Sequence, residues 1–142
     1  MLKYPMEFTS KSSAQAGINQ NWSCQTPEFE GQLAVPKEFM GPGGAASPED
    51  LFCLALSNCF LATFKVYAEN SKLNYDPVEV DSKLIVDLDD NKKPVMKSLK
   101  GLVKITGASD TAKALFLAKK AASAGFILNS VKTDCTFEFD IS

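Results

Sequence analysis

The chain has 142 residues, of which 45% are apolar and 23% are charged, and its formal net charge is −2. This length and balance predict one globular domain over residues 1–142 and exclude a disordered chain. The sequence has no basic cluster, so it also lacks the phosphate-neutralising surface that a nucleic acid requires. We therefore expect no nucleic-acid partner.

All fifteen cationic residues are lysines, and the chain contains neither arginine nor histidine. This composition excludes a nucleophile–histidine couple, a histidine-ligated metal site and a guanidinium clamp on a peroxide. The cysteines at positions 24, 53, 59 and 135 show neither a CxxC motif nor zinc-ligand spacing. We expect no metal, no cofactor, and reduced thiols in a cytoplasmic protein.

The N-terminal segment and the longest apolar run predict neither export nor a membrane span. Residues 1–16 include Lys3, Glu7 and Lys11, so they lack the apolar core of a secretory signal. The apolar run over residues 51–64 is shorter than the ~20 residues that a bilayer-spanning helix needs.

The first half of the chain predicts three strands, a loop and a long helix. Alternating apolar and polar residues predict strands over residues 4–8, 18–24 and 29–35. Residues 36–47 contain three glycines and two prolines, which predicts a loop. Ser47 is the expected N-cap of a helix that begins at Pro48 and runs to about Ser71.

The second half predicts a hairpin, a helix and a last strand. Alternation predicts strands over residues 78–88, 96–106 and 131–141. Ser109 or Asp110 is the expected cap of a second helix, which ends near Gly125. The fold class is therefore α+β, in the order β-β-β-α-β-β-α-β.

The first helix is apolar on every side. At 100° per residue its large apolar side chains surround the axis: Leu51, Phe52, Leu54, Leu56, Phe60, Leu61 and Phe64. About 22 helical residues span roughly 33 Å, close to the ~37 Å diameter of a domain of this size. One short chain cannot cover such a helix. We predict a long buried central helix in an intimate homodimer, where it packs against its symmetry mate or the partner's sheet.

Cys59 lies in the middle of this helix, where apolar neighbours shield its thiol from bulk water. Such a position suits thiol chemistry on an apolar substrate, and it suits an inert structural cysteine equally well. On composition alone the inert interpretation is favoured.

The residues before and around Cys59 resemble the OsmC/Ohr family of osmotically inducible and organic hydroperoxide resistance proteins. The resemblance is carried by the run Val-Pro-Lys-Glu-Phe-Met-Gly-Pro-Gly-Gly-Ala-Ala-Ser-Pro-Glu-Asp-Leu-Phe over residues 35–52 and by Ser-Asn-Cys-Phe over 57–60. It extends through the order of elements to Asn-Ser-Val at 129–131. It implies an intertwined dimer with a thiol peroxidase site at the subunit interface.

The resemblance also implies a role for individual residues. Cys59 would attack the peroxide, and Glu49 would orient an arginine that holds the thiolate. A second cysteine near the end of the second helix would resolve the sulfenic acid as a disulfide, which dithiol reductants reopen. Here Gly125 stands at that second position, and no arginine exists in the chain. The sequence thus describes a divergent member without the family arginine and second cysteine.

The missing cation bears on the roles expected for Cys59 and Glu49. Apolar burial raises the pKa of a thiol and slows its reactions, so we expect Cys59 to be a slow nucleophile. Glu49 suits the helix dipole equally well, and about 15 Å of helix separates it from Cys59, so contact would have to cross the dimer. Cys53 and Cys135 are interpreted as core residues, with Cys24 the remaining candidate for a replacement resolving thiol.

Three functions follow as hypotheses. The first is a thiol-dependent peroxidase of the oxidative or osmotic stress response, which reduces organic hydroperoxides through Cys59 and is recycled by an external thiol. The alternative is a degenerate family member that binds a small apolar or lipid-like ligand without turnover. A further alternative is a purely structural or stress-induced binding module. The absent arginine favours the alternative, whereas Pro48, Glu49 and Cys59 favour the peroxidase.

Overall fold

A computed structural model describes residues 2–142, which form two compact units. The first unit ends at Leu51, and the second is Phe52–Ser142. The elements are, in order, β1 (Lys11–Ser13), β2 (Trp22–Thr26), β3 (Phe29–Leu33), the short 3₁₀ helix η1 (Lys37–Phe39), α1 (Pro48–Asn70), β4 (Val78–Leu88), β5 (Pro94–Ile105), α2 (Thr111–Ala124), the short 3₁₀ helix η2 (Leu128–Ser130) and β6 (Asp134–Ile141). This order confirms the α+β prediction. The prediction of one domain over residues 1–142 stays a prediction.

The first unit contains an antiparallel sheet in the order β1-β2-β3. β2 and β3 form a hairpin in which Trp22 pairs with Leu33 and Thr26 pairs with Phe29. The predicted strand over residues 4–8 is wrong, because the first strand is β1 and Phe8 is 92% exposed. Alternation specifies a strand only when one face is buried, and these side chains face solvent.

The second predicted strand exists but begins later than expected. Residue 18 lies in a turn that follows Gly17, whose φ of 112° places it in the region that favours glycine. β2 therefore starts at Trp22. The prediction for the third strand is confirmed by β3, two residues shorter than expected.

A reciprocal cap starts α1 at the predicted residue. The Ser47 amide donates a hydrogen bond to the Asp50 carboxylate at 2.8 Å, and the Asp50 amide donates to the Ser47 hydroxyl at 3.1 Å. This arrangement satisfies amides that the first helical turn leaves without partners. Pro48 occupies the first helical position, where its missing N–H costs nothing.

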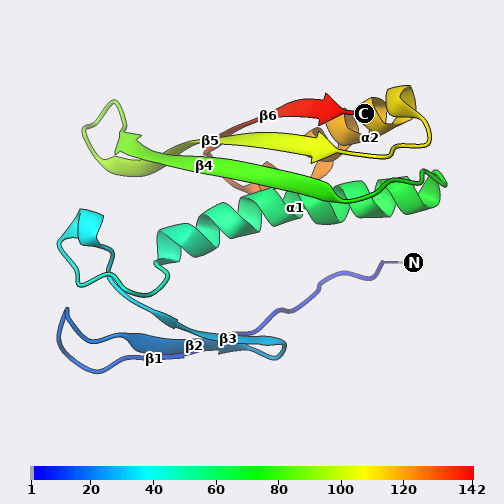
Figure 1. Ribbon diagram of the computed structural model, residues 1–142. Helices are drawn as coiled ribbons and strands as arrows, with labels where there is room; N and C mark the ends of the chain where they lie inside the picture. The colour runs from blue at the N-terminus through cyan, green and yellow to red at the C-terminus, as the bar shows by residue number, and fades with distance from the viewer. Residues whose placement is uncertain (1) are drawn as a thin grey trace. The chain divides into compact units, whose positions relative to one another are not determined.

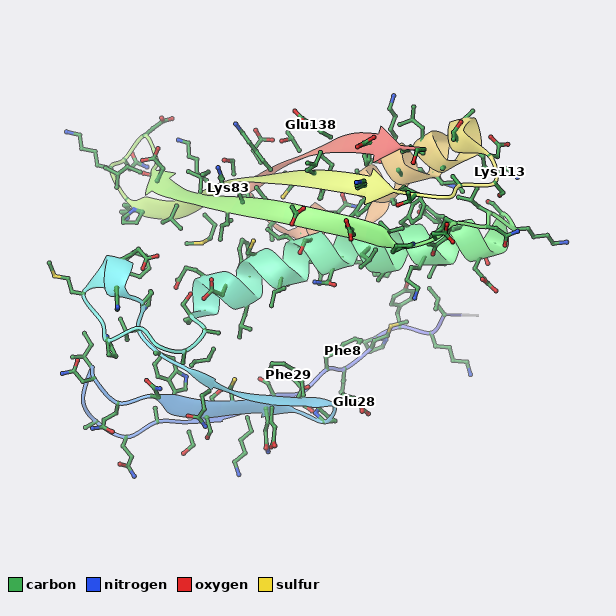
Figure 2. All side chains as sticks on the ribbon, in the orientation of Figure 1. Phe8, Glu28, Phe29, Lys83, Lys113 and Glu138 are labelled. Atoms are coloured by element: carbon green, nitrogen blue, oxygen red, sulfur yellow. The ribbon has the colours of Figure 1, made fainter. Side chains whose placement is uncertain are left out.

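The second unit is a three-stranded sheet with α1 running along one face (Figure 1). β4 and β5 form the predicted antiparallel hairpin, whereas β5 and β6 are parallel and are joined by a crossover through α2. Leu99, Val103 and Ile105 of β5 are fully buried. The alternate positions face solvent, as Lys83 and Glu138 do in Figure 2.

One stripe of α1 covers this sheet. Leu56, Phe60, Phe64 and Ala68 recur every fourth residue and are all buried. The Phe60 ring stacks on the Phe137 ring of β6 with a centroid separation of 5.0 Å. Stacked rings and buried area together make this contact the centre of the core.

Another part of α1 remains exposed within one chain. Leu54 and Val66 are each 56% exposed, although the sequence makes the helix apolar on all sides. This agrees with the expectation that one chain cannot cover the helix. The homodimer itself stays a prediction.

By length and composition alone, the 23 residues of α1 could cross a membrane. The apolar run over residues 51–64 is shorter than a bilayer span, but the complete helix is longer. This is weak evidence for a span, because core helices pass the same test. The full burial of Phe60 and Phe64 against the sheet favours a core helix.

The central role of Phe60 gives the first prediction. We expect Phe60→Ala to lower the free energy of unfolding by about 3–5 kcal/mol, because it empties a fully buried ring site. Phe116→Ala on α2 is the matched control, since that ring is 65% exposed and its removal should cost less than about 1 kcal/mol. Urea denaturation measures both, and equal losses in the two variants would contradict the assignment.

Candidate functional site

The Cys59 thiol is half-buried and packs against the core of the second unit. Its sulfur lies beside the backbone of Gly125, directly after α2. A Cβ atom added to Gly125 would lie 2.6 Å from Cys59 Sγ and 3.2 Å from Leu128 Cδ1. No real Cβ fits at 2.6 Å from a sulfur atom, so only glycine allows the chain to pass so close to the thiol.

This contact changes the interpretation of Gly125. The sequence predicted a helix-ending glycine, and the helix does end at Ala124. However, Gly125 has φ −64° and ψ 136°, an extended conformation that any residue adopts. Its smallness is therefore required by the approach to Cys59 rather than by the turn.

The same contact bears on the missing second cysteine. The resemblance placed that thiol at position 125, and the structure brings position 125 directly against Cys59 Sγ. Because residue 125 is glycine, the second thiol is absent and the backbone of Gly125 contacts the Cys59 sulfur. The place that the resemblance assigned to a resolving thiol thus adjoins Cys59 but has no side chain.

Cys135 is the second thiol in the neighbourhood of Cys59. It is the second residue of β6, lies opposite Leu99 of β5, and donates a long hydrogen bond to the Thr133 carbonyl at 3.5 Å. Burial raises the pKa of the Cys135 thiol above its ordinary value, and the negative charges of Asp134 and Cys59 raise it further. The predicted core packing of Cys135 is confirmed. Its electrostatic interaction with Cys59 was not predicted.

Glu49 lies half-buried in the first turn of α1. Its neighbour Asp50, and not Glu49, engages the Ser47 cap. Along the helix, about 15 Å separates Glu49 from Cys59, so α1 itself does not bring the two side chains together. A role for Glu49 beside a thiol stays a prediction.

The other two cysteines lie in different surroundings. The Cys24 thiol donates to the Gly31 carbonyl at 3.7 Å, within the β2–β3 hairpin. Cys53 packs against the same core as Cys59, as predicted, and its carbonyl accepts a hydrogen bond from Ser57.

Within residues 2–142, no side chain donates a hydrogen bond to the Cys59 sulfur, and no group of three or more carboxylates and thiols is arranged to hold a metal ion. The Lys120 ammonium of α2 lies 4.6 Å from the centre of the Tyr67 ring, two turns further along α1. That lysine is engaged with an aromatic face rather than with the thiol.

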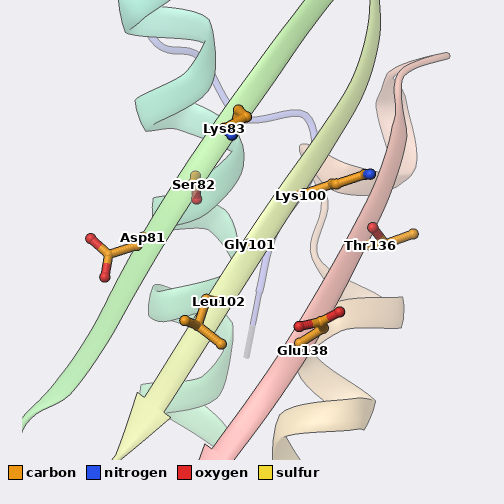
Figure 3. A pocket seen from close by; sticks show the side chains of 8 residues that line it. All are labelled: Asp81, Ser82, Lys83, Lys100, Gly101, Leu102, Thr136 and Glu138. Carbon is orange, nitrogen blue, oxygen red and sulfur yellow. The ribbon is translucent and has the colours of Figure 1, made fainter.

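A shallow hollow of about 400 Å³ lies on the outer face of the second sheet (Figure 3). Six of the eight residues that line it are polar or charged, namely Asp81, Ser82, Lys83, Lys100, Thr136 and Glu138, and the other two are Gly101 and Leu102. Lys100 and Leu102 alternate along β5 with the buried Leu99 and Val103, so the hollow and Cys59 lie on opposite faces of the sheet. The hollow is therefore not part of the thiol site.

Two uncharacterised bacterial proteins are similar to this chain in sequence. An uncharacterised protein of Acinetobacter baylyi is 36% identical over 67 residues, which are 47% of this chain and only 47% of that relative. The uncharacterised protein YmaD of Bacillus subtilis is 25% identical over 139 residues, which cover 95% of this chain and 93% of YmaD.

Solved structures with the same fold match almost the whole chain. An OsmC-like protein of unknown function from Vibrio cholerae has a TM-score of 0.85 at 15% identity, over 96% of this chain and 100% of its own. An organic hydroperoxide resistance protein OsmC from Legionella pneumophila has a TM-score of 0.75 at 24% identity, over 99% of both chains. The organic hydroperoxide resistance protein OhrB of Bacillus subtilis has a TM-score of 0.66 at 16% identity, over 95% of this chain and 98% of its own.

These structural likenesses agree with the order of the elements along the chain. The family model for OsmC-like proteins matches residues 41–140, which is more than half of the sequence. The chain therefore belongs to the OsmC-like protein family, as a member that contains no arginine and has glycine at position 125.

Proposed function

We propose that this protein is a thiol-dependent peroxidase that reduces organic hydroperoxides through Cys59, as part of an oxidative or osmotic stress response. The observation that carries the proposal is the Cys59 sulfur, half-buried on an apolar helix and directly against position 125. Two relatives of the same fold are named for organic hydroperoxide resistance, in Legionella pneumophila and in Bacillus subtilis.

The reaction needs a nucleophilic sulfur and a proton for the alkoxide that leaves. The Cys59 thiolate attacks the distal peroxide oxygen, the O–O bond breaks, and an alcohol leaves after taking up a proton. Apolar walls around the sulfur favour an organic hydroperoxide over a strongly hydrated oxidant. An external thiol then returns the oxidised cysteine to its reduced form.

A second candidate function is binding without turnover. The absence of arginine and histidine supports it, because a buried thiol with no cation beside it is a weak nucleophile. Any side-chain cation at this site has to be a lysine. In this alternative the apolar surroundings of Cys59 hold a small apolar or lipid-like ligand.

The proposal includes the state and location of the protein. A homodimer would cover the exposed face of α1, on which Leu54 and Val66 lie, and would give Glu49 its route to the partner's thiol. A cytoplasmic location suits a chain that works with reduced thiols. The partners are thus a second copy, an apolar hydroperoxide and an external thiol reductant.

Peroxide turnover by variants tests the proposal. We expect Cys59→Ser to abolish consumption of cumene hydroperoxide in the presence of a dithiol, because it removes the sulfur that attacks the peroxide. Glu49→Gln should reduce turnover by about tenfold or more if the carboxylate orients a group at the partner's thiol. The assay is loss of peroxide with time.

Cys53→Ser is the matched control, because Cys53 lies on the same helix and packs against the same core. It should keep the wild-type rate. Equal turnover in wild-type protein and Cys59→Ser would eliminate the peroxidase and leave ligand binding as the function.

The exposed face of α1 gives a separate test of the assembly. We expect Leu54→Glu to convert the dimer to a monomer, because it places a charge in the apolar interface that the homodimer needs. Leu102→Glu, at a position 49% exposed on the outer face of the second sheet, is the matched control and should stay dimeric. Analytical ultracentrifugation distinguishes the two states, and an unchanged dimer in Leu54→Glu would remove this face from the interface.

A further inference from the structure

We propose that the outward side of α2, together with the turn that follows it, is a docking surface for a bilayer of anionic lipids. The protein lies on the bilayer through this surface and does not span it. Docking goes beyond the proposed peroxidase and does not depend on it. We name this surface the basic face and define it by six exposed residues: Lys113, Phe116, Lys119, Lys120, Phe126 and Ile127.

The charge of the chain is unevenly distributed along its sequence. Residues 111–133 contain four lysines and no acidic residue, so this segment has a formal charge of +4. The other eleven lysines and the seventeen acids leave −6 for the rest of the chain. Salt limits the reach of a charge to about 8 Å at physiological ionic strength, so a nearby surface responds to the local segment rather than to the net charge.

Three of these lysines surround an exposed phenylalanine on α2. Lys113 precedes Phe116 by three residues, whereas Lys119 and Lys120 follow it by three and four, so all of them lie on one side of the helix. The ring site of Phe116 points away from the core, because this residue is 65% exposed. The opposite side of α2 carries its buried residues: Ala114, Leu117, Ala118 and Ala121.

The positive charge of the basic face is not neutralised within the chain. Among residues 2–142, none of its three ammonium groups forms an ion pair with a carboxylate. Lys113 donates a hydrogen bond to the Ser71 carbonyl at 3.3 Å, and Lys120 Nζ lies 4.6 Å from the centre of the Tyr67 ring. Both contacts leave the charge in place, and the lysines themselves are exposed.

The apolar part of the basic face continues past the end of α2. Phe126 is 67% exposed and Ile127 is 44% exposed, directly after the helix. With Phe116, three large apolar side chains are therefore exposed within twelve residues that also carry lysines. This combination is typical of interfacial helices, whose rings enter the boundary between headgroups and acyl chains while the lysines extend to the headgroups.

Charge and apolarity together favour anionic lipid over other occupants. Clusters of about four or more lysines on amphipathic helices bind anionic lipid, and residues 111–133 contain four. Double-stranded nucleic acid offers phosphates but no apolar layer for the exposed rings. A second copy docked face to face would place lysines against lysines across a two-fold axis, which opposes association through this surface.

Co-sedimentation with vesicles tests the docking surface. We expect the full chain to bind vesicles that contain phosphatidylglycerol and not vesicles of phosphatidylcholine alone, with binding that weakens as salt is raised. The double variant Lys113→Gln/Lys119→Gln should weaken binding by about tenfold or more, because it removes two of the charges that attract the headgroups. Lys83→Gln/Lys100→Gln removes the same charge from exposed positions on the second sheet, so this matched control should bind as the wild type does.

Tryptophan fluorescence tests whether the basic face enters the lipid. Trp22 is the single tryptophan of the chain, so Trp22→Phe provides a background without tryptophan emission. In this background we expect brominated lipid in anionic vesicles to quench the emission of Phe116→Trp. Phe8→Trp is the matched control, because Phe8 is 92% exposed and lies in the first unit, and its emission should be unaffected.

Several results would overturn the docking surface. These are binding to neither kind of vesicle, equal binding to both kinds, equal weakening in the two double variants, or absence of quenching in Phe116→Trp. Retention on immobilised polyglutamate without vesicle binding would assign the basic face to an acidic protein instead. A lower oligomeric state of Phe116→Ala with unchanged vesicle binding would assign it to a second copy. Cys59→Ser should bind vesicles as the wild type does, so failure of the peroxidase leaves the docking surface intact.

Discussion

The packing of one stripe of α1 against the sheet β4-β5-β6 is the constraint on which the candidate site depends. Phe60 and Phe64 are fully buried, so the rotation of the helix about its axis is fixed. Cys59 precedes Phe60 by one residue and is turned about 100° from the stripe, which directs its thiol to the end of α2. The site is thus positioned by hydrophobic packing and not by hydrogen bonds to the thiol.

The elements with strong local signals were predictable from sequence. Ser47 and Asp110 cap the helices as expected, because a side-chain acceptor at that position satisfies free amides. β4 has the predicted bounds, since one of its faces is buried and its alternation reports that face. The strand expected at residues 4–8 is wrong because Tyr4, Met6 and Phe8 are exposed, so their alternation with polar residues does not mark a buried sheet face.

The candidate site was predictable only in part. A resemblance in sequence identified Cys59 and position 125, and the structure brings them together. The relation of Cys59 to Cys135 was not predictable, because it depends on the parallel pairing of β5 with β6 after the α2 crossover. The close approach of Gly125 to Cys59 was also not predictable. A glycine after a helix usually indicates a left-handed turn, whereas Gly125 has an extended backbone.

The apolar surroundings of Cys59 favour the substrate but disfavour the reactive form of the thiol. An apolar environment admits apolar hydroperoxides and slows access of hydrated oxidants, but it also disfavours the thiolate that must react. A guanidinium resolves this conflict by pairing with the sulfur, and this chain contains none. With lysine as the remaining side-chain cation, the compensation requires an ammonium group, which is more strongly hydrated and costs more to bring into an apolar site. A peroxidase built from these residues would therefore gain selectivity for apolar substrates and would lack the guanidinium that stabilises a reacting thiolate.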